Sequence, residues 1–475
     1  MLSKVLYYFE ELTKIPHGSG NTKAISDFCV DFAKNHNLKY YQDDSNNVII
    51  YKKGNKDTAP LMLQGHLDMV CEKDPDVDFD FTKDALKLVR DENTLKAEGT
   101  TLGGDDGIAV AMCLAILDDD TLTHPDLEIV FTTDEETGMF GAHALDAAKL
   151  TSKRLLNIDS EDENVLTVGC AGGARAEIKL PIKKQQIPKD NENCYKVTVA
   201  GLIGGHSGVE IDKGRLNSNI VMGEYLEFLL DHDYNLRIFD IRGGKADNVI
   251  PNETEATIFA EYAGDYKSQN ELKDVTKEFI EINKLPTDPN LTIDIEPAKA
   301  SERLLGSLDT ERVVNFLCST PNGIQAMSGD IPGLVETSLN LGQLFITEND
   351  AVMRFSVRSS VTKDKEKLLE RLNNKAKEFD GSMTSDGHYP AWEYMKVSPF
   401  RDKVKEAFTE VFKTEPKVEA IHAGLECGIF CEKIENLEAV SIGPNLTDIH
   451  TPRETLDLIS TEKTIKAVIK ILETV

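Results

Sequence analysis

The sequence predicts an α/β protein in which a mixed, mostly parallel sheet carries helices on both faces and an α+β domain is inserted into the main one. Apolar strands alternate with helical segments up to Asp159, which is typical of a parallel sheet. Several of these strands run directly into histidine or acidic residues, which is the pattern of a ligand site at the carboxyl edge of such a sheet. After residue 186 the chain changes to short strands with alternating apolar and polar residues, which favours antiparallel pairing.

This change of pattern divides the chain into two domains. We expect residues 1–186 and 386–475 to form the main domain and residues 187–385 to form the inserted one. A length of 475 residues exceeds that of one ordinary domain, which supports the division. The polar segment 183–190 marks the first boundary, and the alternation of helices and strands returns near the second.

The spacing of apolar residues predicts the elements in order. Two amphipathic helices come first, and the second is capped by Asn21 or Thr22. Apolar runs then predict strands of the main domain at 39–42, 47–51, 60–66, 127–133, 154–158 and 438–442, and helices at 108–117, 399–412 and 460–474. In the inserted domain we expect strands at 195–200, 238–241, 256–260, 291–295, 337–341 and 352–358, and helices at 214–231, 266–283 and 364–379.

Composition excludes several classes of partner and location. The net charge of -29 argues against nucleic acid and against anionic membranes. No apolar run reaches the length of a membrane span, and the N-terminal stretch has no small-residue cleavage site of a signal peptide. Eight scattered cysteines without a C-x-x-C pair indicate free thiols in a reducing compartment. We therefore expect a cytoplasmic protein.

The strand at 60–66 ends in a histidine and is followed by a carboxylate two residues later. Side chains at i and i+2 of a strand point to the same face, so His66 and Asp68 are expected side by side at the sheet edge. A metal-binding histidine usually donates its second ring N–H to a carboxylate. Asp68 is placed to orient His66 in this way.

Acidic residues follow three further stretches of the main domain. They occur in the glycine-rich turn Gly103–Gly107, in Asp134–Gly138 after one strand, and in Asp159–Glu161 after another. Histidine with several carboxylates and no cysteine suits zinc, cobalt or manganese, and a pair of such ions needs about five ligating side chains. The chain offers His66, Asp105, Glu136, Asp159 and His450. Because two metal ions activate water, a general base is also needed, and Glu135 is the natural candidate.

The order of these motifs resembles that of the M20 metallopeptidases. The resemblance rests on His66-Leu67-Asp68, Gly104-Asp105, Glu135-Glu136, Asp159, the segment 204–208 (Gly-Gly-His-Ser-Gly) and the late His450. The segments 103–107, 422–428 and 441–444 are similar to the aminoacyl-histidine dipeptidase branch of that family. The resemblance implies metal-dependent hydrolysis of dipeptides, including Xaa-His dipeptides such as carnosine, by a homodimer whose inserted domain serves as a lid and for dimerisation.

The resemblance also implies a role for each residue. His66 and Asp159 would bind one divalent ion, Glu136 and His450 the other, and Asp105 would bridge the two; zinc is expected first, with cobalt or manganese as alternatives. Asp68 would orient His66, and Glu135 would be the general acid/base. His206 would stabilise the oxyanion, across a dimer or a closed cleft, and Asn248 would hold the small peptide substrate.

Several alternatives remain open at the level of sequence. Asp106 stands where the family often has asparagine, so Asp105 and Asp106 both qualify as the bridge, although Asp106 is also interpreted as a helix cap. His422 and Glu426 lie in a glycine-rich turn and are interpreted as substrate-binding residues, with a helix cap as the alternative for Glu426. Related hydrolases of this family act on N-acyl amino acids or tripeptides, and a scaffold protein without activity is disfavoured because every ligand is present.

Overall fold

The chain folds into two units, each built around its own sheet. The computed structural model describes residues 1–186, 193–263, 269–299 and 303–475. The first unit comprises Met1–Cys170, Tyr394–Ala420 and Leu425–Val475, and the second comprises Ala171–Glu393 and Ile421–Gly424. The second unit thus begins at residue 171, whereas the sequence places the change at 187, because the strand that follows Cys170 pairs within the second sheet.

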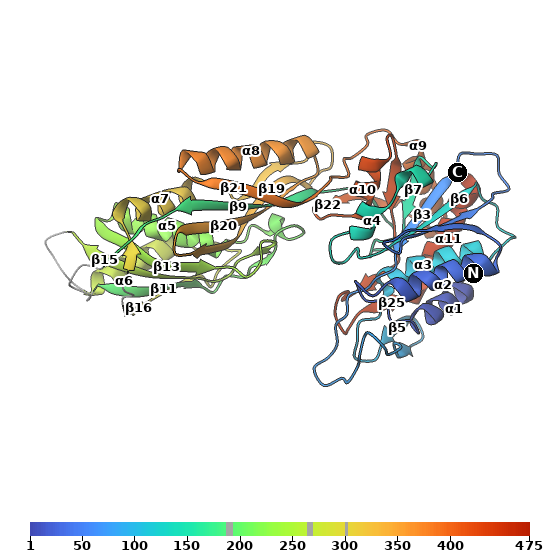
Figure 1. Cartoon of the computed structure of the whole chain (residues 1–475), viewed down its shortest axis with the longest axis horizontal. Coiled ribbons are helices and arrows are strands. Elements are labelled where there is room, and N and C mark those ends of the chain that lie inside the picture. Colours follow the sequence, from blue (N-terminus) through green and yellow to red (C-terminus); the bar gives the residue numbers. More distant parts are fainter. Residues whose placement is uncertain (187–192, 264–268, 300–302) are drawn as a thin grey trace. The chain divides into compact units, whose positions relative to one another are not determined.

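The first unit contains an eight-stranded sheet in the order β1-β2-β6-β3-β7-β23-β8-β22 (Figure 1). Its four central strands, β6, β3, β7 and β23, are parallel, and antiparallel strands flank them. The predicted α/β fold with a mixed, mostly parallel sheet is therefore confirmed. The strands are β1 (Lys39–Gln42), β2 (Val48–Lys52), β3 (Leu61–His66), β6 (Leu127–Thr132), β7 (Arg154–Asn157), β8 (Val165–Cys170), β22 (Lys417–Ile421) and β23 (Glu438–Ser441).

Helices cover this sheet. Helix α3 packs on β3, and α1 packs outside α3; in Figure 1 the helices α1 to α3 lie below the sheet and α9 lies above it. Every side chain of β3 is buried, as expected for a central strand of a covered parallel sheet. The helices are α1 (Leu2–Leu12), α2 (Lys23–Asn35), α3 (Gly104–Leu117), α4 (Phe140–Ala144), η1 (Ala147–Lys149), α9 (Pro399–Phe412), α10 (Glu426–Lys433) and α11 (Leu458–Thr474).

A small four-stranded sheet in the order β24-β25-β5-β4 completes the first unit. It consists of β4 (Leu88–Arg90), β5 (Thr94–Ala97), β24 (Leu446–Thr447) and β25 (Thr455–Asp457). Because β24 and β25 pair with each other, the loop between them, which carries His450, is the connection of a hairpin. The pairing of β25 with β5 ties this hairpin to the segment that leads into α3.

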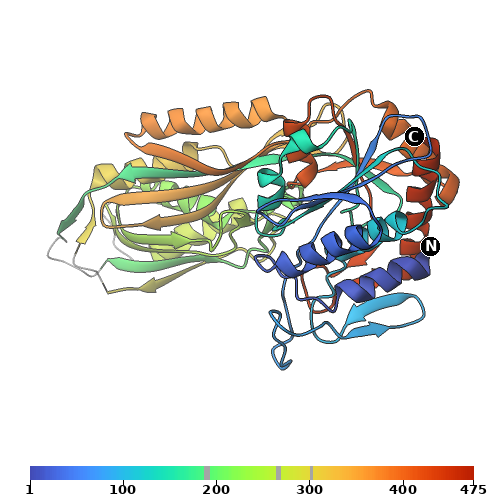
Figure 2. The same cartoon turned by 45° about the vertical axis from the view of Figure 1, so that its right-hand side comes forward.

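The second unit is an α+β unit built on a nine-stranded sheet in which all described pairings are antiparallel. Helix α8 packs along β9, β20 and β21 in both views (Figures 1 and 2). The strands are β9 (Gly172–Pro181), β11 (Cys194–Ala200), β13 (Tyr234–Gly243), β15 (Thr254–Tyr262), β16 (Thr292–Pro297), β18 (Gly323–Met327), β19 (Val335–Ile346), β20 (Asp350–Ser359) and β21 (Ser382–Tyr389). Its helices are η2 (Ile211–Lys213), α5 (Ser218–Asp231), α6 (Gln269–Asn283), α7 (Ser307–Ser319) and α8 (Thr362–Glu378), and two strand pairs stand apart, β10 (Lys184–Gln186) with β17 (Arg303–Leu305) and β12 (Gly205–His206) with β14 (Val249–Ile250).

Most expected elements are present at or near their predicted positions. The helix predicted over 399–412 is α9, and the antiparallel strands predicted at 337–341 and 352–358 lie in the paired strands β19 and β20. Residues 187–190 of the predicted polar segment and 266–268 of a predicted helix lie outside the described residues. None of the described helices combines the length and the apolar character that a membrane span needs. All eight cysteines lie in the described residues, and none of them forms a disulfide.

Candidate metal centre

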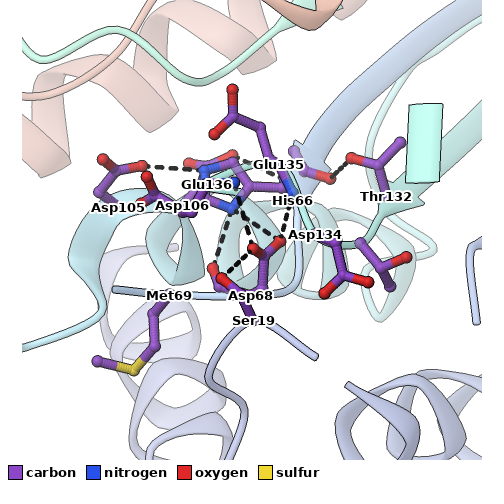
Figure 3. A network of polar contacts seen from close by, with 12 residues as sticks. Ser19, His66, Asp68, Met69, Asp105, Asp106, Thr132, Asp134, Glu135 and Glu136 are labelled. Atoms are coloured by element: carbon purple, nitrogen blue, oxygen red, sulfur yellow. Dashed lines mark hydrogen bonds and ion pairs between the residues drawn. The ribbon is translucent and has the colours of Figure 1, made fainter. Parts of the chain in front are cut away.

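The parallel strands of the first unit bring acidic residues and a histidine to one edge of the sheet. His66 is the last residue of β3, Glu135 and Glu136 follow β6, and Asp159 follows β7. Because parallel strands end at the same edge, these side chains meet although they are far apart in the sequence. Asp105 joins them from the first turn of α3 (Figure 3).

His66 is held from both sides of its ring and is almost fully buried. Its Nδ1 lies 2.9 Å from the backbone oxygen of Asp68, which can only accept, so Nδ1 carries the hydrogen. The other ring nitrogen, Nε2, faces two carboxylates, Oδ1 of Asp105 at 3.0 Å and Oδ1 of Asp159 at 3.5 Å. Because Nδ1 is engaged by the backbone, Nε2 is the ring nitrogen that a metal ion would bind in place of a proton.

The Asp105 carboxylate lies between two histidines. Its Oδ1 is 3.0 Å from His66 Nε2, and its Oδ2 is 3.2 Å from His450 Nε2. His450 Nε2 is also 3.0 Å from Glu136 Oε1. The structure therefore brings all five predicted ligands into one cluster.

Three overlapping groups of this cluster have their ligating atoms within 4.8 Å of one another. They are His66 with Asp106 and Asp159, His66 with Glu135 and Glu136, and Asp105 with Glu136 and His450. Two of the groups share His66, and two share Glu136. Such overlap is what a pair of neighbouring ions requires.

Asp106 is oriented differently from its neighbour. It is 2% exposed, and its Oδ2 accepts a hydrogen bond of 3.1 Å from the backbone N–H of His66. Gly103 is the N-cap of α3, but the backbone leaves helical φ/ψ at Asp105 and Asp106, so capping of the following turns by Asp106 stays a prediction. Asp106 connects the first turn of α3 to the end of β3.

The hydrogen bonds of the Asp68 carboxylate go to a hydroxyl and to backbone N–H groups rather than to the imidazole. It accepts hydrogen bonds from Ser19 Oγ at 2.8 Å, from the N–H of Glu135 at 3.0 Å and from the N–H of Glu136 at 3.3 Å (Figure 3). Its Oδ1 is 3.6 Å from His66 Nδ1, which is beyond hydrogen-bonding distance. In this structure Asp68 therefore orients His66 through its carbonyl oxygen, and its carboxylate positions the turn that carries the two glutamates.

The charges of the cluster fit divalent cations. Burial raises the pKa values of Asp106, Glu135, Glu136 and Asp159, because several carboxylates share one desolvated site. Hydrogen bonds with Asp105 and Glu136 raise the pKa of His450 to about 10. Nitrogen and carboxylate donors without sulfur are the set that zinc, cobalt or manganese binds, and bound cations would offset the excess negative charge.

Three other predicted site residues, His206, Asn248 and His422, belong to the second unit. The Nδ1 of His206 accepts hydrogen bonds of 3.2 Å from the backbone N–H groups of Gly208 and Val209. A neutral ring at this position therefore carries its hydrogen on Nε2.

The other two residues of this group differ in exposure. Asn248 is exposed, and its backbone carbonyl oxygen accepts a hydrogen bond of 2.9 Å from the backbone N–H of Ser207. His422 is buried, and its Nε2 lies 2.7 Å from Ser338 Oγ. Burial and the charge of Arg358 lower the pKa of His422 to about 4, so the ring is neutral.

Glu426 lies in the first unit and is fully buried. Its Oε2 accepts hydrogen bonds from Gln64 Nε2 at 2.5 Å and from Thr132 Oγ1 at 2.7 Å. Gln64 Oε1 in turn accepts from Asn157 Nδ2 at 2.6 Å. Glu426 thus joins a network of β3, β6 and β7 side chains, and its zero exposure does not support the predicted contact with substrate.

Replacing Glu426 by glutamine should change how stability depends on pH. Burial raises the pKa of Glu426 from 4.5 to about 8, so the folded protein keeps this proton over a range in which the unfolded chain has lost it. Stability of the wild type should therefore fall as pH rises from about 4.5 to about 8, and Glu426→Gln should remove that decline. Urea unfolding of the metal-free proteins at pH 5 and pH 8 would measure it.

A second variant separates this titration from loss of the network. Glu426→Ala leaves the Gln64 amide and the Thr132 hydroxyl without their buried partner, which should cost about 1–3 kcal/mol at both pH values. Equal pH dependence in the wild type and in Glu426→Gln would show that Glu426 is ionised throughout.

The sequence analysis did not identify several residues that hydrogen-bond to the segments carrying the predicted ligands. Glu454 accepts hydrogen bonds from the turn that precedes Asp105, and nothing in its sequence context marks it, because its partners lie 349 to 352 residues away. Gln64 and Asn157 carry a signal that could have been used. Both are buried amides next to apolar residues of a central strand, and buried amides need partners.

Comparison with known proteins adds family information to this geometry. Residues 62–474 match the family described as "Peptidase family M20/M25/M40". The chain is 34% identical to the cytosol non-specific dipeptidase of Escherichia coli over 451 residues, which cover 94% of this chain and 92% of the relative.

Solved structures show the same similarity. The aminoacylhistidine dipeptidase from Vibrio alginolyticus superposes with a TM-score of 0.91 at 31% identity, covering 100% of this chain and 96% of that one. A tripeptidase from Staphylococcus aureus has a TM-score of 0.56 at 15% identity, covering 100% of this chain and 98% of that one, and so shares the fold alone.

Proposed function

The chain belongs to peptidase family M20/M25/M40, and from this premise we propose that it is a metal-dependent dipeptidase of the cytoplasm. The observation that carries the proposal is the Asp105 carboxylate, whose two oxygens lie 3.0 and 3.2 Å from the Nε2 atoms of His66 and His450. The similarity to relatives named as dipeptidases over nine-tenths of their length supports the reaction.

We propose that His66 and Asp159 hold one divalent ion, that Glu136 and His450 hold the other, and that Asp105 contacts both. The group of Asp105 with Glu136 and His450 supports the assignment of the second ion. The distances from His66 Nε2 to Asp105 and Asp159, 3.0 and 3.5 Å, support that of the first. Zinc suits these donors, with cobalt or manganese as alternatives. When bound, such ions activate water and polarise the carbonyl of the scissile bond.

Glu135 is proposed as the general acid/base. Its backbone N–H is fixed by the Asp68 carboxylate at 3.0 Å, and its side chain lies in the same group of atoms as His66 and Glu136. Burial and neighbouring carboxylates raise its pKa, which brings a carboxyl group closer to the range in which it both accepts and returns a proton. Glu135 would take a proton from the attacking water and deliver it to the leaving amine.

The roles of the second unit remain predictions from the family resemblance. His206 is proposed to donate from Nε2 to the oxyanion, and the two backbone hydrogen bonds to its Nδ1 support that tautomer. Asn248 is proposed to hold the substrate, and the unit as a whole to act as a lid and in a homodimer.

The proposed substrates are dipeptides, with Xaa-His dipeptides such as carnosine among them. One relative is named a non-specific dipeptidase and the other an aminoacylhistidine dipeptidase, which together favour a broad dipeptide range that includes histidine at the second position. Hydrolysis of N-acyl amino acids or tripeptides is the alternative, because the same metal site serves those reactions in the family.

A hydrolysis panel tests the proposal. We expect the purified protein to cleave dipeptides, including β-alanyl-histidine, and to cleave N-acetyl amino acids and tripeptides much more slowly, as measured by release of free amino acids. Preferential cleavage of N-acetyl amino acids or tripeptides would replace the dipeptidase assignment with its alternative.

The metal requirement provides the control for this panel. Dialysis against a chelator should abolish cleavage, and addition of zinc, cobalt or manganese should restore it, because the proposed reaction depends on metal ions to lower the pKa of the attacking water and to polarise the carbonyl. Full activity of protein shown to be metal-free by elemental analysis would refute the metal mechanism.

A further inference from the structure

One buried carboxylate receives hydrogen bonds from four consecutive backbone N–H groups of the glycine-rich turn. The Oε2 of Glu454 accepts from the N–H groups of Leu102 at 2.7 Å and Gly103 at 3.1 Å. Its Oε1 accepts from those of Gly104 at 2.8 Å and Asp105 at 3.2 Å. Glu454 is 3% exposed, so these bonds are shielded from water.

Only an ionised carboxylate can satisfy this arrangement. Four donors require four lone pairs on two oxygens, which a carboxylate offers and a protonated acid or an amide does not. The first N–H groups of a helix have no partner within the helix, so a carboxylate placed there is also favoured by the helix dipole. The contacts thus select for glutamate rather than for a polar side chain of the same size.

The glycines of the turn allow this close approach. Gly103 has a φ of 66°, in the left-handed region that favours glycine. A Cβ on Gly104 would lie 2.8 Å from a Leu446 side-chain carbon and 3.1 Å from Glu454 Oε1. The turn can therefore wrap around the carboxylate only because these positions lack side chains.

Glu454 connects two segments that both carry predicted ligands. Asp105 is the last of the four donor residues, and His450 lies four residues before Glu454 in the loop between β24 and β25. The side chain of His450 is 44% exposed, so little packing holds it. The anchor at Glu454 limits how far this loop and the turn can move apart.

We propose that Glu454 is a positioning residue, whose carboxylate fixes the Leu102–Asp105 backbone and the end of the 448–454 loop so that Asp105 reaches both His66 and His450. The inference rests on the proposed metal-dependent function. Replacing a residue that orients a metal ligand through a hydrogen bond typically lowers metal affinity by about 10–100-fold.

Glu454→Gln is the decisive variant. The glutamine keeps the size of the side chain, but its NH₂ group faces two backbone N–H donors and cannot accept from them. We expect it to weaken Mn²⁺ or Zn²⁺ binding by about 10–100-fold in competition with a chromogenic chelator. The Mn²⁺-loaded variant should also lose the spin coupling between two bridged ions in its electron paramagnetic resonance spectrum. Activity should fall mainly in kcat, with KM changed less.

Glu128→Gln is the matched control. Glu128 is also buried, and its carboxylate accepts from the backbone N–H groups of Thr151 and Ser152, but it lies at the beginning of β6, whereas the predicted ligands follow the other end of that strand. Glu128→Gln should lower thermal stability while leaving metal affinity and spin coupling at wild-type values. A merely structural role for Glu454 predicts the same result for both variants.

Two outcomes would overturn the proposal: wild-type metal affinity and coupling in Glu454→Gln, or an equal loss of metal affinity in Glu128→Gln. If Glu454→Gln does not fold, Glu454→Asp decides by the same criterion, since it keeps the charge but is one methylene too short to reach all four donors. Because metal binding is measured without substrate, failure to cleave dipeptides would contradict the proposed function and leave this test intact.

Discussion

Glu135→Ala is expected to bind both metal ions and to lose nearly all hydrolysis. The proposed ligands do not include Glu135, and the turn that carries it is held by backbone N–H bonds to Asp68, which the substitution leaves in place. Removing the general acid/base should lower kcat by at least about 10²–10⁴-fold. Steady-state kinetics on a dipeptide, with metal content from elemental analysis of the same sample, would measure both effects.

Glu135→Gln separates proton transfer from side-chain size. It fills the same space without a group that takes up a proton, so we expect it to be as inactive as Glu135→Ala. An alanine variant that retains substantial turnover would overturn the assignment of Glu135. A variant that loses metal would instead show that Glu135 is itself a ligand.

Asp105→Asn is expected to lose metal, whereas Asp106→Asn should keep it. Both oxygens of Asp105 face a histidine nitrogen, and an asparagine offers only one oxygen there, so the shared contact is lost. We expect the affinity for metal to fall by at least about 10–100-fold, because replacing residues that only hydrogen-bond to metal ligands already has an effect of this size. Isothermal titration of the metal-free proteins with Zn²⁺ would measure it.

Asp106→Asn is the control for this comparison. Asp106 uses one oxygen to accept from the N–H of His66, and an asparagine supplies the same acceptor. Burial already raises the pKa of Asp106, so a neutral side chain at this position should cost little. The reverse ranking of the two variants would identify Asp106 as the bridging ligand.

The predicted metal ligands came from local sequence patterns. His66, Glu136 and Asp159 lie in or just after a strand that is recognisable as a short apolar run, and the chemistry of a strand end depends on a few adjacent residues. The carboxyl ends of parallel strands lie at one edge of the sheet. Once the fold class is predicted, the residues that follow these strands are therefore expected to lie close together. The sequence of His450 alone gives no such signal, and the order of family motifs identified it.

Contacts between distant segments were beyond such patterns. The Asp68 carboxylate lies 3.6 Å from His66 Nδ1, and its hydrogen bonds go to the backbone of residues 135 and 136, because the turn after β6 brings these two N–H donors within reach. Glu426 is predicted to contact substrate, and in the structure it accepts hydrogen bonds from Gln64 and Thr132 within the first unit, which its sequence context does not indicate. The partners of Asp68 are backbone N–H groups, which nearly every residue has. Those of Glu426 are an amide and a hydroxyl, which are common side-chain groups, so no sequence motif identifies either set.

The sequence by itself determined the fold class and named candidate metal-binding side chains, because strand and helix periodicity and ligand chemistry are local properties. The tertiary structure decided what each carboxylate contacts. Asp105 and Asp106 are adjacent and chemically identical, but the backbone at Asp105 has a ψ of 105° inside the first turn of α3, which directs the two side chains differently. That backbone is held by Glu454, whose partners lie about 350 residues away, and only folding brings them together.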